Sequence, residues 1–345
     1  MTKFTKLLMV ILVIVFSVTI SHAGWGDKTT TIKFMSKDLD SFVDVLDGLE
    51  NDKDVKIYGK LTIPKETKGK IPCVIYMHGA SGGFTENAKR RIDPWLRMFN
   101  KMGIATFKLD SFKGRNVKSV VANQTAVTTK EMVVDVYKAL EVMAAHPRID
   151  KDNIGIMGGS KGGYVAFMAM WKPMYEAIGV EAKFAFHISL YASPYEFEDF
   201  RFMNAPLLIL VGDADDWCPA EPWKEVAAKM TSHNYDVELV IYKGAHHSFD
   251  ASYAPRTYSK GHSYTNCRWA VTKEGYAWET STGLEEIEGM KKCRNESSGV
   301  TVGYNKAAKK ASKIKAAEFV ARVLNLKIPE KVVKKADNSS TSTDR

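Results

Sequence analysis

Residues 153–170 have the sequence NIGIMGGSKGGYVAFMAM, and this stretch decides the fold. The apolar run 153–157 predicts a strand, and the residues after the second pair of glycines, to about Met170, predict a helix. The Gly-rich segment between them must turn the chain sharply, because glycines without a Cβ let the strand and the helix approach closely. The pattern G-x-S-x-G in this setting places Ser160 at the turn, with its hydroxyl exposed above a sheet. A phosphate-binding loop is the alternative, but its G-x-x-x-x-G-K-[ST] pattern is absent.

Strand and helix patterns alternate on both sides of this turn. Period-two or continuous apolar runs predict strands, and apolar residues at helical spacing predict helices. The expected strands are 55–63, 71–77, 104–109, 153–157, 184–191, 206–211 and 237–242, and the expected helices are 88–102, 129–145, 164–170, 221–232 and 305–324. Such alternation predicts an α/β fold, with a doubly wound, mostly parallel sheet that carries helices on both faces.

Two segments depart from this alternation. Residues from about 251 to 302 are aromatic, polar and rich in turns, which predicts an insertion between the last strand and the last helix. Residues 329–345 are rich in Lys, Ser and Thr and predict a flexible C-terminal tail. We therefore expect one domain over residues 24–328, although a chain of 345 residues leaves room for two.

The N-terminus has the pattern of a signal peptide over residues 1–23. Lys3 and Lys6 precede an apolar run, 7–20, and Ser21-His22-Ala23 offers small residues at the cleavage positions. An uncleaved membrane anchor is the alternative, but the run has about 14 residues and a membrane span needs about 20. We therefore expect an exported protein, periplasmic or secreted, without stable membrane insertion after cleavage.

Export would place the four cysteines in an oxidising compartment. Cys267 and Cys293 flank a polar, irregular segment within this insertion, and a disulfide between them is the simplest of three possible pairings. It would close a loop of about 25 residues and contribute roughly 3 kcal/mol. Cys73, in an apolar run, and Cys218, in a short loop, are then expected to be free thiols packed in the interior.

The formal net charge is +9, and Lys and Arg are spread along the chain. The sequence has no basic stripe interleaved with aromatic residues and no nucleic-acid-binding motif. We expect a solvated basic surface and no nucleic-acid partner. Clusters of His and Cys at metal-ligand spacing are also missing, so we expect neither a metal nor an organic cofactor. Oligomeric state is left open.

A serine hydroxyl needs a base, and the base needs an acid that orients it. His246 and His247 follow the last predicted strand, where a doubly wound sheet places its site. Between Ser160 and these histidines, the strand 206–211 ends in three acidic candidates. We rank Asp215 first, Asp216 second and Asp213 last, because Asp213 lies so close to the strand end. The chain order Ser, Asp, His is the one expected for this topology.

A tetrahedral intermediate needs donors for its oxyanion. The strand 71–77 leads into the Gly-rich loop His78-Gly79-Ala80-Ser81-Gly82. We expect the backbone N–H groups of Ala80 and Lys161 to point at the developing charge. An ordinary turn is the alternative, and His78 is expected to brace the loop.

Four motifs together resemble the dienelactone hydrolase family within the α/β-hydrolases. They are HGASGG at 78–83, GGSKGG at 158–163, GDADDWCP at 212–219 and YKGAHHSF at 242–249. The resemblance covers roughly residues 59–250 and 303–324. It implies the α/β-hydrolase fold, places the family's acid on Asp215, and places its base on His247 rather than His246.

The resemblance has further implications. Asp110-Ser111-Phe112, followed by Arg115, looks like the family's loop beside the site. The cysteine-flanked insertion is similar to that of a bacterial subgroup and would lie near the mouth of the site. Dienelactone hydrolases use a cysteine nucleophile, whereas this chain has Ser160. Related exported serine members resemble carboxylesterases.

We therefore expect a serine hydrolase that cleaves a carboxylic ester or lactone, a small-molecule substrate, through an acyl-enzyme. Two alternatives remain. One is a peptidase or acyltransferase with the same three residues, and the other is a non-catalytic binding protein of this fold. All three residues are present, whereas a binding protein would be expected to have lost one.

Overall fold

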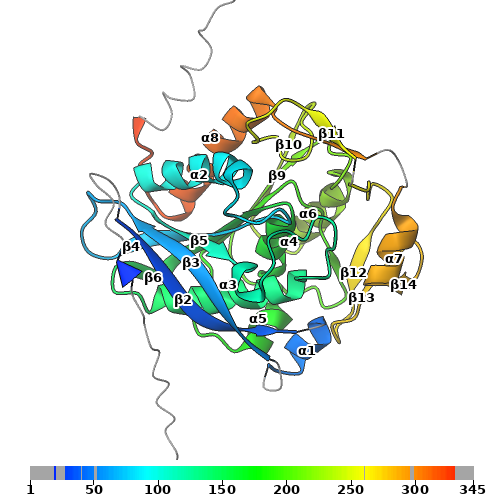
Figure 1. The fold of residues 1–345 in the computed structure, drawn as a ribbon, viewed down its shortest axis with the longest axis horizontal. Helices are drawn as coiled ribbons and strands as arrows, with labels where there is room; N and C mark the ends of the chain where they lie inside the picture. Colours follow the sequence, from blue (N-terminus) through cyan, green and yellow to red (C-terminus); the bar gives the residue numbers. More distant parts are fainter. Residues whose placement is uncertain are drawn as a thin grey trace, which may run out of the picture.

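The computed structural model describes residues 19–20, 28–39, 41–49, 53–259, 261–295 and 299–330. Within them a nine-stranded sheet has the order β1-β2-β3-β5-β4-β6-β7-β9-β10 (Figure 1). Its strands are β1 (Thr19–Ile20), β2 (Lys28–Asp38), β3 (Lys53–Ile63), β4 (Ile71–Met77), β5 (Ala105–Asp110), β6 (Ile149–Gly159), β7 (Phe186–Leu190), β9 (Leu207–Gly212) and β10 (Val237–Tyr242).

The sheet is parallel from β5 through β4, β6, β7 and β9 to β10, and antiparallel where β3 joins β5 and where β2 joins β3. The predicted α/β class and the mostly parallel sheet are therefore confirmed. The carboxyl ends of parallel strands meet at one edge of a sheet, which is where such folds place their sites.

Helices cover both faces of the sheet. α2 (Glu86–Lys101) and α8 (Lys306–Val323) pack in one apolar cluster, and α3 (Thr129–Ala144), α4 (Lys161–Met168) and α6 (Glu221–Ser232) pack in another. Strand β4 contributes to both, because alternate side chains point to opposite faces. Its Cys73, Ile75 and Met77 belong to the second cluster, whereas Val74 and Tyr76 belong to the first.

Several elements differ from the sequence prediction. β6 starts at Ile149, four residues before the apolar run, and β2, α1 (Phe42–Leu46), η1 (Lys113–Arg115) and α5 (Lys172–Ile178) were not predicted as elements. A capping box was nevertheless present before α1. Ser41 Oγ accepts from the N–H of Asp44, and the Asp44 carboxylate accepts from the N–H of Ser41.

The insertion consists of short elements. It contains β11 (Arg256–Tyr258), β12 (Trp269–Val271), β13 (Ala277–Glu279), β14 (Leu284–Glu285), α7 (Glu286–Cys293) and β15 (Val300–Val302). β12 pairs in parallel with β8 (Glu196–Phe197), which follows β7, and this pairing joins the insertion to the main domain. The Cys267–Cys293 disulfide is present, and Cys73 and Cys218 are buried free thiols.

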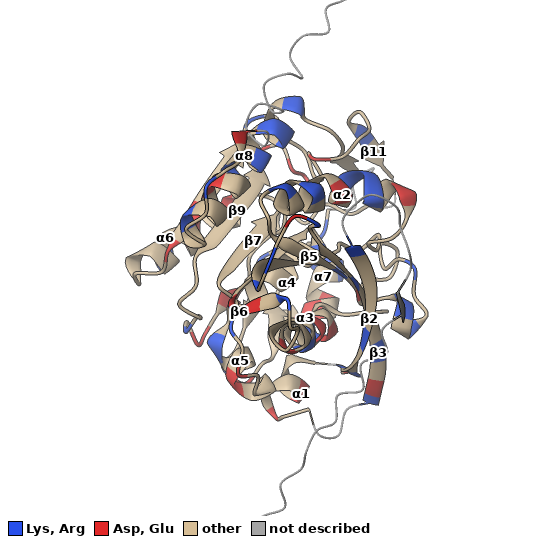
Figure 2. Cartoon of the chain, turned by 90° about the vertical axis from the view of Figure 1, so that its left-hand side faces the viewer, with Lys and Arg blue, Asp and Glu red and all other residues tan. Residues whose placement is uncertain are grey.

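Most of the predicted signal peptide, residues 1–18 and 21–23, lies outside the described residues, as do residues 331–345 of the predicted tail. Thr19 and Ile20 pair antiparallel with β2. Among the described helices, none combines the length and the apolar character that a membrane span requires. Lys and Arg gather along α2 and α8, with acidic residues between them (Figure 2).

Candidate active site

Ser160 lies at the turn between β6 and α4 with φ 57° and ψ −126°. A positive φ is strained for a residue with a side chain, and such strain concentrates at functional sites. The turn depends on its glycines. A Cβ on Gly158 would lie 2.1 Å from the carbonyl oxygen of Gly162, and one on Gly162 would lie 2.2 Å from that of Met77. The Gly-rich turn expected from the sequence is therefore required by close backbone contacts on both sides of Ser160.

Hydrogen bonds join Ser160 to His247 and Asp215. His247 Nε2 lies 3.0 Å from Ser160 Oγ, and His247 Nδ1 lies 2.9 Å from Asp215 Oδ2. With the proton on Nδ1, the imidazole donates to the carboxylate, and Nε2 is free to accept from the serine hydroxyl. The second oxygen of Asp215 accepts from the N–H groups of Trp217 and Cys218 at 2.9 and 2.8 Å. Both the acid and the imidazole are buried, and these bonds hold them in one orientation.

The other two acidic candidates bind backbone elsewhere. Asp213 Oδ1 accepts from the N–H of Gly244 at 2.6 Å, which joins the loops after β9 and β10. Asp216 accepts from the N–H of Thr301 at 2.8 Å, which holds β15. The structure therefore places only Asp215, of these three, against a histidine.

The remaining histidine candidates are also accounted for. His246 Nδ1 bonds to the carbonyl oxygen of Ala214 at 2.8 Å, so this ring binds backbone. His78 is fully buried, which lowers its pKa. Its Nδ1 donates to the carbonyl oxygen of Gly79 at 2.9 Å, and its Nε2 accepts from the N–H of Ser111 at 3.3 Å. These bonds brace the Gly-rich loop from within, as expected.

Ala80 and Lys161, the predicted oxyanion donors, line the same cavity as Ser160. The N–H of Ala80 belongs to the Gly79–Ala80 peptide, whose carbonyl oxygen accepts from the N–H of Gly82 at 3.0 Å, and this bond holds the peptide. Lys161 is the first residue of α4, where N–H groups have no carbonyl partner within the helix and the helix dipole favours negative charge. The Lys161 ammonium donates to the backbone oxygen of Gln124 at 3.0 Å, and burial lowers its pKa to about 8.

Arg115 lies in a buried ion-pair network and does not line the cavity. Its guanidinium contacts Asp38 at 2.6 Å, Asp135 at 2.7 Å and Glu131 at 3.1 Å. The loop after β5 therefore contacts the site where the N–H of Ser111 donates to His78, which braces the Gly-rich loop. Arg115 instead joins β2 to α3.

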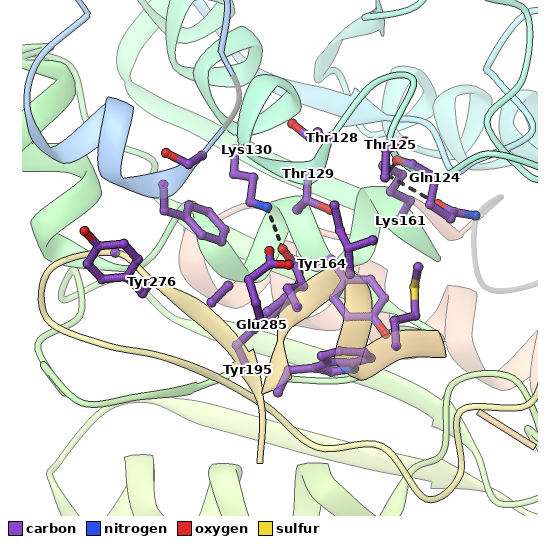
Figure 3. Close-up of a pocket in the computed structure, with 18 of the residues that line it drawn as sticks. Gln124, Thr125, Thr128, Thr129, Lys130, Lys161, Tyr164, Tyr195, Tyr276 and Glu285 are labelled. Atoms are coloured by element: carbon purple, nitrogen blue, oxygen red, sulfur yellow. Dashed lines mark hydrogen bonds and ion pairs between the residues drawn. The ribbon is translucent and has the colours of Figure 1, made fainter. Parts of the chain in front are cut away.

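The cavity has a volume of about 440 Å³, within the range of small-molecule sites. Its lining comes from the start of α1, the loops after β4, β7 and β9, the loop before α3 with the start of that helix, the turn at Ser160 with the start of α4, and the insertion. Figure 3 shows Lys161 and Gln124 in contact on one side, and Lys130, Tyr195 and Tyr276 around the rest of the space. Phe42, Lys130, Tyr195 and Glu286 were not predicted as site residues, because no motif marks them and they come together only through folding.

Aromatic rings cover His247. Trp217 lies 4.9 Å from the imidazole between ring centroids, and Tyr258 of β11 stacks on Trp217 at 5.7 Å. This covering keeps water away from the Asp215–His247 pair, where a lower dielectric strengthens the hydrogen bond. Among the described residues there is no group of three or more His, Cys, Asp or Glu that could hold a metal ion.

The sheet order and the serine at a strained strand-to-helix turn define an α/β-hydrolase fold. The family model of the dienelactone hydrolase family matches residues 57–274, and the chain belongs to this family. The expected family resemblance is thereby confirmed.

Two curated relatives agree with this family, and a solved structure agrees with the fold. A protein of Bradyrhizobium sp., named "Probable 2-oxo-3-(5-oxofuran-2-ylidene)propanoate lactonase", is 26% identical over 52% of this chain and 74% of its own length. A Yersinia pestis protein named "Putative carboxymethylenebutenolidase" is 27% identical over 41% of this chain and 53% of its own. A dienelactone hydrolase-like promiscuous phosphotriesterase from metagenomic libraries has a TM-score of 0.50 and 14% identity, over 85% of this chain and 98% of its own, which supports the fold alone.

Proposed function

We propose that the protein is a serine hydrolase that cleaves carboxylic esters or lactones through an acyl-enzyme. The observation that carries this proposal is the continuous chain of hydrogen bonds from Asp215 through His247 to Ser160. The names of the curated relatives, a lactonase and a carboxymethylenebutenolidase, support the ester or lactone bond as the target.

In the first half of the reaction, Ser160 Oγ attacks the carbonyl carbon while His247 Nε2 takes the hydroxyl proton. Asp215 holds the imidazole in the required tautomer and stabilises the imidazolium. The N–H groups of Ala80 and Lys161 stabilise the oxyanion. When the tetrahedral intermediate collapses, the carbon–oxygen bond to the alcohol breaks and His247 donates its proton to the leaving oxygen.

In the second half, His247 takes a proton from water, and the hydroxide attacks the acyl carbonyl. The bond to Ser160 Oγ then breaks, the carboxylic acid leaves, and Oγ recovers its proton from His247. In a lactone the alcohol stays attached to the acyl chain, so that both halves of the reaction proceed on one molecule. These steps need only Ser160, His247, Asp215, the two N–H donors and water.

Ser160→Ala tests the nucleophile directly. It should lower kcat for p-nitrophenyl acetate by roughly 10⁴-fold or more, because the other members of the triad cannot replace the missing oxygen. A fluorophosphonate probe should label the wild-type protein at Ser160 and leave the variant unlabelled. A folded Ser160→Ala protein, checked by circular dichroism, that kept its turnover would refute the proposal.

We also propose that the protein is exported. The Cys267–Cys293 disulfide supports this, because such bonds persist in oxidising compartments. N-terminal sequencing of the protein from the periplasm or medium should begin at Gly24, and a retained Met1 would contradict export by a cleaved signal.

A further inference from the structure

The cavity extends well beyond the reacting serine. Ser160, Ala80 and Trp217 line one part of it, and Phe42 of α1 and Tyr276 of the insertion line another. α1 and the turn before β13 are in contact, since a Cβ on Gly275 would lie 2.9 Å from the backbone carbon of Phe42. The distal part of the cavity is therefore built where α1 meets the insertion.

Rings connect the two parts. Tyr164, four residues after the nucleophile, lies 6.0 Å from Tyr195 between ring centroids, and Tyr195 lies 6.4 Å from both Phe42 and Trp269. All four aromatic residues line the cavity. Packing alone could explain the buried rings, but Tyr276 keeps 63% of its surface exposed while lining the same space. These rings form an aromatic surface that runs from the nucleophile to the exposed ring of Tyr276, and such a surface is suited to an apolar ligand group.

The insertion wall is fastened to the main domain. Glu286, at the start of α7, accepts from the Lys130 ammonium at 2.5 Å and from the Tyr195 hydroxyl at 2.6 Å. Burial by itself would raise the pKa of Glu286, but Lys130 and the Tyr195 hydroxyl hold it below its usual value. The disulfide closes the C-terminal end of the same helix. This wall is therefore a preorganised surface, which lowers the cost of ordering a bound group.

The distal wall lies outside the part of the chain that the family model describes. That model matches residues 57–274, whereas α1 and the lining residues from Gly275 to Met290 fall before and after it. The family match therefore does not describe this wall, and loops held by a rigid scaffold often carry the binding residues.

We propose that the substrate ester carries an extended apolar group with a ring, which lies along Tyr164, Tyr195 and Trp269 toward α1 while the carbonyl is at Ser160. This inference rests on the proposed function and adds the substrate class to it. An acetyl ester would leave most of the roughly 440 Å³ unfilled. The ring can belong to the acid or to the alcohol, and the same experiment separates the two.

The experiment compares methyl acetate with methyl 3-phenylpropanoate, which carries the ring on the acid, and with 3-phenylpropyl acetate, which carries it on the alcohol. At least one ring-bearing ester should exceed methyl acetate in kcat/KM by about tenfold or more, the discrimination that a few buried carbons provide. Ile287→Trp, on the cavity side of α7, should lower kcat/KM for the ring-bearing ester far more than for methyl acetate and so remove this advantage. Glu288→Trp is the matched control. Glu288 is the next residue on the same helix, and its side chain is exposed and does not line the cavity.

Binding provides a second readout that does not depend on turnover. Calorimetry of the Ser160→Ala protein with the preferred ring-bearing ester should give a Kd that Ile287→Trp weakens by about tenfold and Glu288→Trp leaves unchanged. If Ile287→Trp does not fold, Met290→Trp fills the cavity from the same helix. Equal kcat/KM for all three esters, or a preference that both cavity variants leave intact, would overturn the proposal. Binding without turnover of any ester would instead contradict the proposed function.

Discussion

The cavity has two walls that are built in different ways. On the sheet side, Ser160, Asp215 and His247 follow β6, β9 and β10, which have eleven, six and six residues in one sheet, and each of the three residues has a hydrogen bond to a backbone group that holds it. On the insertion side, strands of two or three residues and the eight-residue α7 are held by a disulfide, an ion pair and one parallel strand pairing. The difference teaches that the reacting groups follow long-range strand pairing in the main sheet, whereas a large part of the remaining cavity wall comes from the insertion.

The largest expected effect is on the sheet side. Asp215→Asn should lower kcat for p-nitrophenyl acetate by about 10⁴-fold, because an amide favours the wrong imidazole tautomer. Asp216→Asn is the matched control on the adjacent residue. It binds the backbone of Thr301 and contacts neither His247 nor Ser160, so kcat should stay nearly unchanged. Equal losses in the two variants would remove the distinction between the walls.

The next effect is on the insertion side. The double variant Cys267→Ser, Cys293→Ser should lose about 3 kcal/mol of stability, because the disulfide closes a loop of 26 residues. We expect a lower midpoint in denaturant unfolding and a reduced preference for ring-bearing esters, while hydrolysis of methyl acetate persists.

Dithiothreitol should reproduce this change in the wild-type protein and have no further effect on the double variant. A complete loss of methyl acetate hydrolysis would show that the insertion also supports the sheet side, and the proposed separation of the two walls would then be wrong.

The smallest effect is a difference in how acid changes the stability contributed by the sheet and by the insertion. Burial lowers the pKa of His187, in β7, to about 4, and its Nε2 has no hydrogen-bond partner among the described atoms. The unfolded chain takes up this proton near pH 6.5 and the folded chain only near pH 4, so stability falls as the pH falls between these values, by at most about 3 kcal/mol. Glu286 has a lowered pKa, so its contribution is lost only below the ordinary carboxyl range.

Urea unfolding at several pH values between 4 and 6.5 checks this difference. His187→Gln should reduce the dependence of the unfolding free energy on pH in this window, to which the buried His78 also contributes, whereas Glu286→Gln should leave the slope as it is in the wild-type protein. A slope that Glu286→Gln removes would place the acid sensitivity in the insertion instead.

Sequence prediction was accurate where the signal is local. The continuous apolar run of β4 and the bounds of α6 and β10 agree with the structure residue for residue, because their periodicity and their flanking residues lie within the same few positions. β2 was missed as an element although it has eleven residues. It lies near the antiparallel edge of the sheet, and only three of its residues, at alternate positions, are buried, so its apolar pattern is short. The choice among three aspartates depended on family spacing, because each one has a backbone or imidazole partner that is distant in sequence.

The sequence by itself determined the sheet class, the sharp turn at Ser160 and the chain order of serine, acid and histidine. Each depends on residue type and short-range spacing, and the steric needs of glycine and the period of a strand act over a few residues. Only the tertiary structure decided that Phe42, Tyr195 and Glu286 share a cavity with Ser160. Those contacts join residues far apart in the chain, and they form because burying the rings and pairing Lys130 with Glu286 stabilise one arrangement of the whole molecule.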